Sequence, residues 1–199
     1  MRDKILWIAS EQFSKFGVRA ITMEDIARLA GVSKKTIYQE FKDKKQLVKE
    51  AFSKAMKEDQ DRLNKIMEGE DGVIEHLVYT SKMVRERLAE LNPMALLEVQ
   101  KYFPEVWEMF IEFKEKIIVT DIVNVIEKGK ALGYFRPEIN AKILANMRVD
   151  QISNAMNPSN HERRDFSLLT LHLEMLDHFL HGLFTEKGRQ AYMQKRNSA

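Results

Sequence analysis

Side chains that can hydrogen-bond to base edges or to phosphates crowd a short segment that begins at residue 33. Hydroxyls, amides and lysines set close together on a helix are a usual means by which proteins contact the major groove of DNA. They offer recognition of a polyanion rather than the making and breaking of bonds. The members of the segment are Ser33, Lys34, Lys35, Thr36, Tyr38 and Gln39.

The distribution of charge along the chain favours the same interpretation. The protein has 199 residues and a net charge of +2. Residues 1–50 hold 11 Lys and Arg against 7 Asp and Glu, whereas residues 51–199 hold 21 against 23. A basic part attached to a slightly acidic remainder indicates that the basic part meets a polyanion. An ordinary solvated surface can carry the same balance, so the positions of the charges matter more than their sum.

Catalytic and cofactor chemistry has little support in the sequence. It contains no Cys, which excludes disulfides and thiolate sites, and it has no Gly-rich phosphate loop or Ser nucleophile motif. His178 and His181, with Glu174 or Asp177 nearby, leave a helical metalloenzyme as one alternative. Histidines without a second ligand cluster are more typical of a surface or an interface. We therefore expect no enzyme, no metal and no cofactor.

Three short helices are expected to position the polar segment. An apolar stripe over residues 5–16 predicts the first helix, with Gly17 suited to a left-handed cap. Thr22 and Asp25 have the spacing of a capping box at the start of the second helix. Gly31 permits a sharp turn after it.

Ser33 can cap a third helix, which we expect to run over residues 34–41. Two short helices joined by a tight turn that contains Gly form a helix-turn-helix motif. The segment 41–45 starts a fourth helix, and its positive N-terminal end and lysines can hold a phosphate. The core of this part is predicted to contain Ile26, Ala27, Ile37, Phe41 and Leu47.

The run from Thr22 to Leu47, TMEDIARLAGVSKKTIYQEFKDKKQL, closely resembles the signature of the tetracycline-repressor (TetR) family of regulators. The resemblance extends from about Ile5 to Leu47 without a gap. It includes the preceding amphipathic helix, the Ala-Gly-Val-Ser turn, the Tyr-x-x-Phe and the Lys-x-Lys that follows.

The resemblance implies DNA-contacting roles for the matching positions. Thr22 would touch a phosphate, Tyr38 would reach the backbone, and Lys44 would grip a phosphate at the start of the next helix. The positions that would face the groove are Ser33, Lys34, Lys35 and Thr36.

Three positions within the matching run leave questions open. Lys35 stands where many relatives carry a small residue, so it reads either a base or a phosphate. Glu40 stands where relatives are often aromatic, and its carboxylate would repel phosphate unless it points at Lys44 or solvent. Tyr38 has a core position against the first helix as its alternative.

Helical patterns cover the rest of the chain, without strand alternation, repeats or a linker. The prediction is an all-α fold with a helix-turn-helix domain over residues 1–47 and a helical effector-binding and dimerisation domain over 48–199. The helices are expected near residues 45–67, 73–91, 93–102, 104–132, 139–156 and 166–185, with a polar loop at Asn157–His161.

The last long helix carries two apolar stripes, which indicates burial on two sides. One side can pack inside the domain and the other against a second subunit, with the preceding helix as its neighbour. The TetR resemblance implies the same pair of helices as the dimer interface, and a central helix of a monomeric bundle is the alternative. The predicted interface residues are Ile143, Met147, Leu168, Leu171, Met175 and Phe179.

An effector pocket is expected in the middle of the helical body, on the strength of the resemblance. Bulky Met and aromatic side chains suit a pocket for apolar ligands, although the same side chains at helical spacing also make ordinary core. Arg148, Asp150 and Gln151 interrupt an apolar helix and can orient a polar group or bond across the dimer interface. The predicted pocket residues are Met83, Leu97, Phe103, Trp107, Phe110 and Gln151.

The sequence thus predicts a dimeric, ligand-responsive repressor that binds a palindromic operator in double-stranded DNA and is released by a small apolar effector. The alternative is a helical ligand-binding or adaptor protein that no longer binds DNA. No signal peptide or membrane span is expected, since charges interrupt the apolar stretch over residues 166–184. The expected location is the cytoplasm, with no membrane partner.

Overall fold

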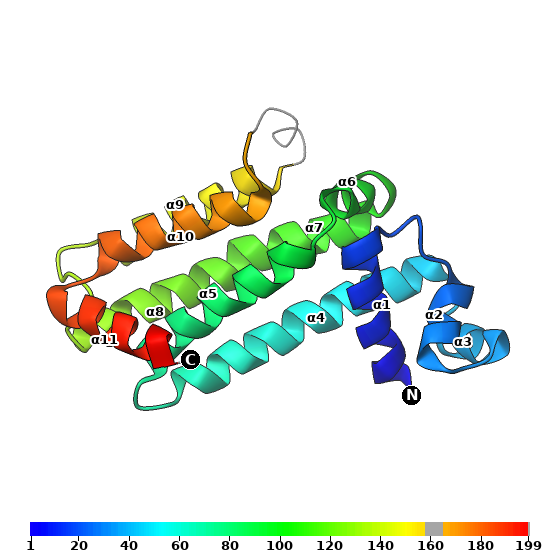
Figure 1. The fold of residues 1–199 in the computed structure, drawn as a ribbon, viewed down its shortest axis with the longest axis horizontal. Coiled ribbons are helices and arrows are strands. Elements are labelled where there is room, and N and C mark those ends of the chain that lie inside the picture. The colour runs from blue at the N-terminus through cyan, green and yellow to red at the C-terminus, as the bar shows by residue number, and fades with distance from the viewer. Residues whose placement is uncertain (158–164, 199) are drawn as a thin grey trace. The chain divides into compact units, whose positions relative to one another are not determined.

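The computed structural model describes residues 1–157 and 165–198, and every regular element in those ranges is helical (Figure 1). The all-α prediction is confirmed. The elements are α1 (Arg2–Phe16), α2 (Met23–Ala30), α3 (Lys34–Glu40), α4 (Lys44–Met67), α5 (Gly72–Glu90), α6 (Pro93–Tyr102), α7 (Pro104–Glu112), the π-helical η1 (Phe113–Ile118), α8 (Val119–Ala131), α9 (Ala141–Met156), α10 (Leu168–Leu183) and α11 (Glu186–Ser198).

The helices form two compact units. Unit 1 consists of Met1–Gln60 and Glu90–Ile111, and unit 2 of Asp61–Ala89 and Glu112–Ala199. Both units draw on α4, whose first part belongs to unit 1. The domain boundary predicted at residue 47 separates the DNA-binding part from the effector-binding part by function. It is a different boundary from that of the two compact units, and it stays a prediction.

The core of unit 1 is apolar and is built where helices α1, α2, α3 and α4 converge. The five predicted core residues, Ile26, Ala27, Ile37, Phe41 and Leu47, are each at most 3% exposed, so that prediction is confirmed. Phe16 is the exception in the first stripe, since 49% of it is exposed at the end of α1.

The caps of α2 and α3 have the predicted geometry. The Thr22 amide donates to the Asp25 carboxylate at 3.0 Å, and the Asp25 amide donates to the Thr22 hydroxyl at 3.1 Å. The Thr36 amide donates to the Ser33 hydroxyl at 3.1 Å. Gly31 has φ 71°, a left-handed conformation that glycine adopts without strain. These contacts fix where each helix begins and the angle at which α3 leaves α2.

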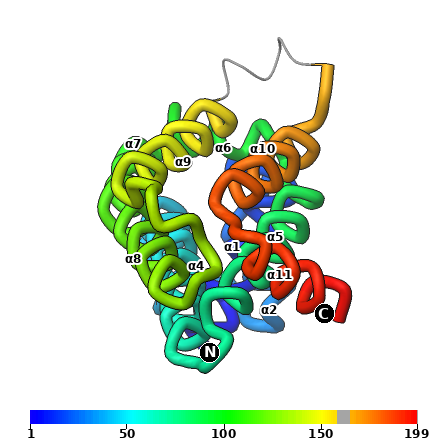
Figure 2. Tube along the Cα trace, turned by 90° about the vertical axis from the view of Figure 1, so that its left-hand side faces the viewer, coloured from blue at the N-terminus to red at the C-terminus, as the bar shows by residue number. Residues whose placement is uncertain are grey.

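Unit 2 places α5, α8, α9 and α10 around one interior, with α11 tied to α5 by an ion pair between Lys195 and Glu75 at 2.6 Å (Figure 2). Gly129 lets α8 approach the loop after it, because a Cβ there would lie 2.2 Å from the ring of Phe135. Buried side chains of this core include Val73, Ile74, Ile126, Phe135, Leu176, Phe179, Leu180 and Leu183.

Two features of unit 2 differ from the sequence prediction. The helix expected at 104–132 is helical over 104–131 but divides at η1, and a π-helical turn leaves no pattern in side-chain type. Helix α11 was not predicted, because only Gly188 and Tyr192 are buried in it and its apolar stripe is too thin to detect. Residues 158–161 of the predicted polar loop lie outside the described residues. Among the described residues, no helix is long and apolar enough to cross a membrane.

Candidate functional site

The polar face of α3 projects from unit 1. Ser33, Lys34 and Lys35 are exposed, Thr36 is half-buried, and Ile37 between them faces the core. Tyr38 is 46% exposed, which argues against its alternative role as a core residue. A short helix held by an apolar core on one side thus presents hydroxyls, a phenol and two ammonium groups on the other.

Lys34 is engaged by a neighbour on α2. Its ammonium forms an ion pair with the carboxylate of Glu24, and this hydrogen bond raises the pKa of Lys34. Both side chains are about two-thirds exposed, at 65% and 64%. Exposed pairs of this kind are weak, so a phosphate can compete with Glu24 for Lys34.

Lys44 lies at the first position of α4 and is half-buried. Its Nζ lies 3.5 Å from the carbonyl oxygen of Arg19, and burial lowers the pKa of its ammonium group. The helix start is capped by Asp43, whose carboxylate accepts from the Gln46 amide at 2.8 Å. Lys44 is therefore held in place beside a helix N-terminus, as the predicted phosphate contact requires.

Glu40 is paired with Arg2, a residue that the sequence analysis did not single out. The guanidinium of Arg2 contacts the Glu40 carboxylate at 3.3 Å and the Glu50 carboxylate at 2.6 Å, and it lies 4.3 Å from the centre of the Phe41 ring. The charge of Glu40 is therefore offset by Arg2, and not by Lys44 or by solvent alone. The partner is 38 residues away in sequence, so no local pattern signals it.

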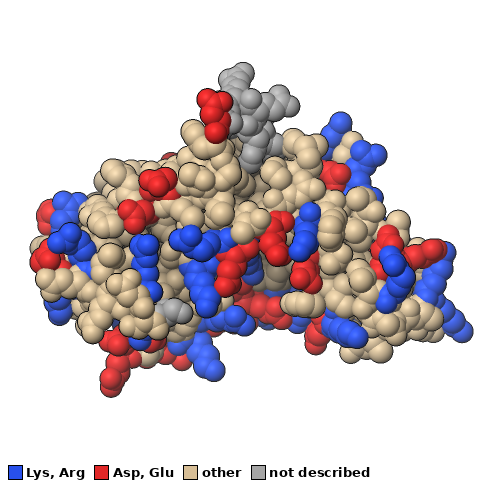
Figure 3. All heavy atoms as spheres, in the orientation of Figure 1, with Lys and Arg blue, Asp and Glu red and all other residues tan. Residues whose placement is uncertain are grey.

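Thr22 is exposed at the start of α2, on the side from which its hydroxyl also caps the helix. In the space-filling view, Lys and Arg side chains project over α2 and α3 with acidic side chains among them (Figure 3). The face offers hydrogen-bond donors and positive charge on a convex, helical surface. Such a surface fits the major groove, where side chains meet base edges and phosphates.

Comparisons with known proteins bear on this face directly. The family described as "Bacterial regulatory proteins, tetR family" matches residues 5–51. An uncharacterized HTH-type transcriptional regulator of Bacillus subtilis, YhgD, is 31% identical over 147 residues, which are 67% of this chain and 71% of YhgD. The chain belongs to the TetR family.

A further relative agrees in sequence, and a solved structure agrees in fold. The HTH-type transcriptional repressor KstR2 of Mycolicibacterium smegmatis is 25% identical over 146 residues, 72% of this chain and 71% of KstR2. A transcriptional regulator from Cytophaga hutchinsonii has the same fold, with a TM-score of 0.68 over 92% of this chain and 98% of that one, at 22% identity. The protein is a DNA-binding transcriptional regulator, and its N-terminal helices carry the family's helix-turn-helix.

The residues predicted for the effector pocket of this TetR-family regulator are divided between the two units. Met83 and Gln151 belong to unit 2, and the remaining four belong to unit 1. Phe103 and Trp107 pack against the unit 1 core, and the rings of Trp107 and Phe110 lie 5.7 Å apart. Leu97 is 37% exposed. The structure thus brings the aromatic members together, and their contact with an effector stays a prediction.

The residues predicted for the dimer interface lie on α9 and α10. Ile143 and Met147 are 63% and 41% exposed, and three residues of α10, Leu168, Leu171 and Met175, are half-buried. Phe179 is 7% exposed in the core of unit 2, so it has little surface to offer a second subunit.

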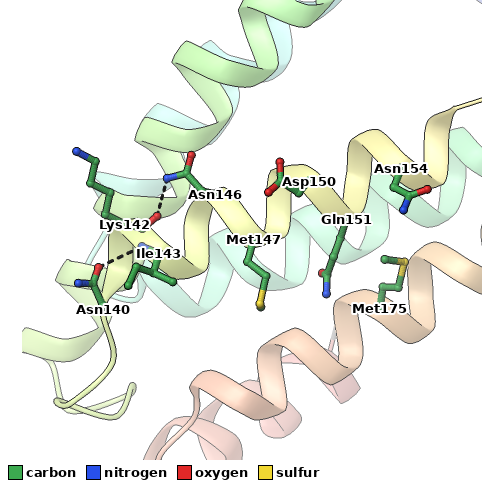
Figure 4. A pocket seen from close by; sticks show the side chains of 9 residues that line it. All are labelled: Asn140, Lys142, Ile143, Asn146, Met147, Asp150, Gln151, Asn154 and Met175. Carbon is green, nitrogen blue, oxygen red and sulfur yellow. Dashed lines mark hydrogen bonds between the residues drawn. The ribbon is translucent and has the colours of Figure 1, made fainter.

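An open groove of about 750 Å³ follows the exposed side of α9, from which Met147 and Gln151 point toward α10, and Met175 of α10 also lines the groove (Figure 4). Its lining also includes Ile143, Asn146, Asp150 and Asn154. In the part of the chain that the structure describes, no three His, Asp or Glu side chains gather as a metal site. The ring of His181 instead hydrogen-bonds the carbonyl oxygen of Asp177 on its own helix, at 2.9 Å.

Proposed function

We propose that the protein is a homodimeric, ligand-responsive repressor that binds a palindromic operator and is released from it by a small effector with a largely apolar body. The name of KstR2 as a repressor supports the direction of regulation. A regulator of this kind works where the chromosome is, so we infer a cytoplasmic location.

The observation that carries the proposal is the exposed polar face of α3. Ser33, Lys35 and Tyr38 point away from the apolar core of unit 1, on a helix whose start is fixed by a side-chain cap. A face with this chemistry and this support has the form of a recognition helix. We assign base-edge and phosphate contacts to Ser33, Lys34, Lys35 and Thr36, and phosphate contacts to Thr22, Tyr38 and Lys44.

The exposed apolar side chains of α9 support the dimer. Ile143 and Met147 stand in water in the single chain, and a second copy packed on the same face would cover both. An interface between identical patches has two-fold symmetry. A two-fold dimer reads two half-sites about 34–36 Å apart, which is why we propose a palindromic operator.

Release by an effector follows from a two-state dimer. An effector that binds better when the two recognition helices do not match successive grooves lowers the affinity for DNA. It shifts the balance only by the difference between its affinities for the two states. As the TetR resemblance implies, we place the effector in the helical body that follows residue 47.

The test is selection from randomised duplex DNA by the purified protein, run beside a Tyr38→Phe/Lys44→Ala variant. Enrichment of a palindrome by the parent protein and its loss in the variant would support the proposal. A DNA-free control is the circular dichroism spectrum, which must stay helical in the variant. No enriched sequence at low salt would favour a helical ligand-binding or adaptor protein that no longer binds DNA.

A further inference from the structure

Four buried polar residues of the described chain all lie in unit 2. His76, Lys114, Arg148 and His172 are each at most 5% exposed, whereas the buried residues of unit 1 are apolar. Burying a polar group costs free energy unless it is hydrogen-bonded or paired. Each of these four groups therefore needs a partner inside unit 2.

Three of the four have partners close by within the unit. His76 contacts the carboxylate of Asp121 at 3.1 Å. Lys114 donates to the hydroxyl of Ser153 at 2.8 Å, and a ring nitrogen of His172 lies 3.1 Å from a backbone oxygen of its own helix.

Arg148 is different. Its guanidinium hydrogen-bonds the side-chain oxygen of Gln151 at 3.4 Å and lies 5.8 Å from the centre of the Phe179 ring. No ion pair to Arg148 is found among the described residues, although a guanidinium has five N–H donors to satisfy. Burial lowers the pKa of Arg148 to about 10, with no carboxylate acting against it.

The position of Arg148 on α9 sets the side from which a partner must come. It lies on the inward stripe with Ala141, Ala145 and Val149, all of which are buried. Asp150, two residues on, is exposed and lies about 200° around the helix. A second subunit that packs on the exposed side of α9 meets Asp150, whereas Arg148 faces the interior.

We propose that Arg148 binds the negatively charged group of the effector, a carboxylate or a phosphate. The inference rests on the proposed function, and it makes the effector an amphipathic anion with an apolar body rather than a neutral apolar molecule. The planar guanidinium holds two oxygens of such a group through parallel hydrogen bonds. The ring of Phe179, whose centre lies 5.8 Å from the guanidinium carbon, offers the apolar body a contact beside the charged group.

Binding of the anion is favoured because the charge of Arg148 has no counterion among the described residues of the ligand-free protein. A buried charge without a counterion destabilises the fold, and the ligand removes that cost when it supplies the opposite charge. The site therefore selects strongly for an anion over a neutral molecule of the same shape.

The experiment compares three probes that share a ten-carbon chain: decanoate and monodecyl phosphate, each below its critical micelle concentration, and decanol below its solubility limit. Binding is measured by calorimetry and by the shift in the thermal unfolding midpoint. The variants are Arg148→Met and, as a matched control, Arg85→Met, which removes an exposed arginine from the same unit. We expect at least one anion to bind the parent about 10- to 100-fold more tightly than decanol.

That preference is expected to vanish in Arg148→Met and to persist in Arg85→Met, and the ligand-free Arg148→Met protein should unfold at a temperature no lower than the parent. Comparison of decanoate with monodecyl phosphate identifies which anion the site prefers. Equal binding of decanol and both anions, or an anion preference that survives in Arg148→Met, would overturn the inference. So would a change from dimer to monomer in Arg148→Met, since Arg148 would then serve a partner subunit's carboxylate.

Selection of DNA by the same parent preparation separates the two proposals. An enriched palindrome without any preference for anions would overturn this inference alone. An anion preference that depends on Arg148, without any enriched DNA, would support the anion site and contradict the proposed function.

Discussion

At the scale of single residues, ion pairs limit the charge that the proposed DNA-reading face, the exposed side of α3 with its neighbours, presents. Glu24 binds the ammonium of Lys34, and Arg2 binds the carboxylate of Glu40. Each pair sets how much charge the face presents before DNA arrives. Two predictions follow from breaking the pairs one at a time.

Replacing Glu24 with Gln should raise the affinity for operator DNA about 2- to 5-fold. Lys34 then meets a phosphate or a base without first leaving an ion pair, and the gain is small because an exposed pair of this kind is weak. The measurement is a fluorescence-anisotropy titration at several salt concentrations. Glu11→Gln, which removes an exposed acidic charge elsewhere in unit 1, is the matched control. An equal gain in both variants would mean that net charge, and not the contact with Lys34, sets the affinity.

Replacing Arg2 with Ala should have two separable effects. The fold should lose about 1 kcal/mol of unfolding free energy, because the guanidinium joins Glu50 and the Phe41 ring through partly exposed contacts. DNA affinity should fall as well, since the carboxylate of Glu40 is left without its partner near the DNA.

The double variant Arg2→Ala/Glu40→Gln should regain DNA affinity while remaining less stable than the parent. Urea unfolding and DNA titration are measured for four proteins: the parent, Arg2→Ala, Glu40→Gln and the double variant. Together they form a double-mutant cycle. If the double variant fails to regain affinity, Glu40 does not lie close enough to DNA to repel it.

At the scale of helices, the side-chain caps of α2 and α3 fix where each helix begins and stabilise the fold. Thr22→Ala removes a side-chain acceptor and one half of a capping box, so the free energy of unfolding should fall by about 1 kcal/mol. Thr22→Ser keeps the hydroxyl and should lose far less. Guanidinium unfolding followed by circular dichroism gives both numbers. A similar loss in the two variants would assign the effect to the methyl group of Thr22 instead of the cap.

Replacing either of two glycines of unit 2 with Ala should change the unfolding free energy, but in opposite directions. In Gly129→Ala the new methyl group meets the buried Phe135 ring at 2.2 Å, so the unfolding free energy should fall by about 1–3 kcal/mol. In Gly182→Ala no atom lies within 4 Å of the new methyl group, and a helix gains about 0.5–1 kcal/mol from Ala in place of Gly. Thermal unfolding of the two variants distinguishes them. A stable Gly129→Ala protein would mean that the Phe135 ring moves aside easily.

The elements themselves were largely predictable, because their signals are local. Thr22 with Asp25, and Ser33 with its helix, are read from neighbours three residues apart, and the core stripe of α1 to α4 repeats at helical spacing. Features made by distant residues were not predictable. Arg2 and Glu40 are brought together only by the fold. In α11, two buried residues in an otherwise polar sequence are too few to form a recognisable apolar stripe. The buried state of Arg148 likewise depends on which side of α9 faces inward.

At the scale of the whole molecule, the proposed dimer sets the spacing at which the two DNA-reading helices meet the operator. The exposed apolar side chains of α9 are the surface on which it depends. Met147→Asp places a charge in the proposed interface, and a buried unpaired carboxylate costs several kcal/mol. We therefore expect a monomer by sedimentation at micromolar concentration, with binding to the palindrome weakened at least about 100-fold.

The control for that change is Met193→Asp on α11, because Met193 has the same 41% exposure as Met147 and lies outside the predicted interface. It should remain a dimer with parental DNA affinity. Binding of a single half-site should be nearly equal in both variants, since each keeps its recognition helix. A dimeric Met147→Asp protein would place the subunit contact elsewhere, and a monomer that still binds the palindrome tightly would mean that two-fold symmetry in the protein is not what reads the operator.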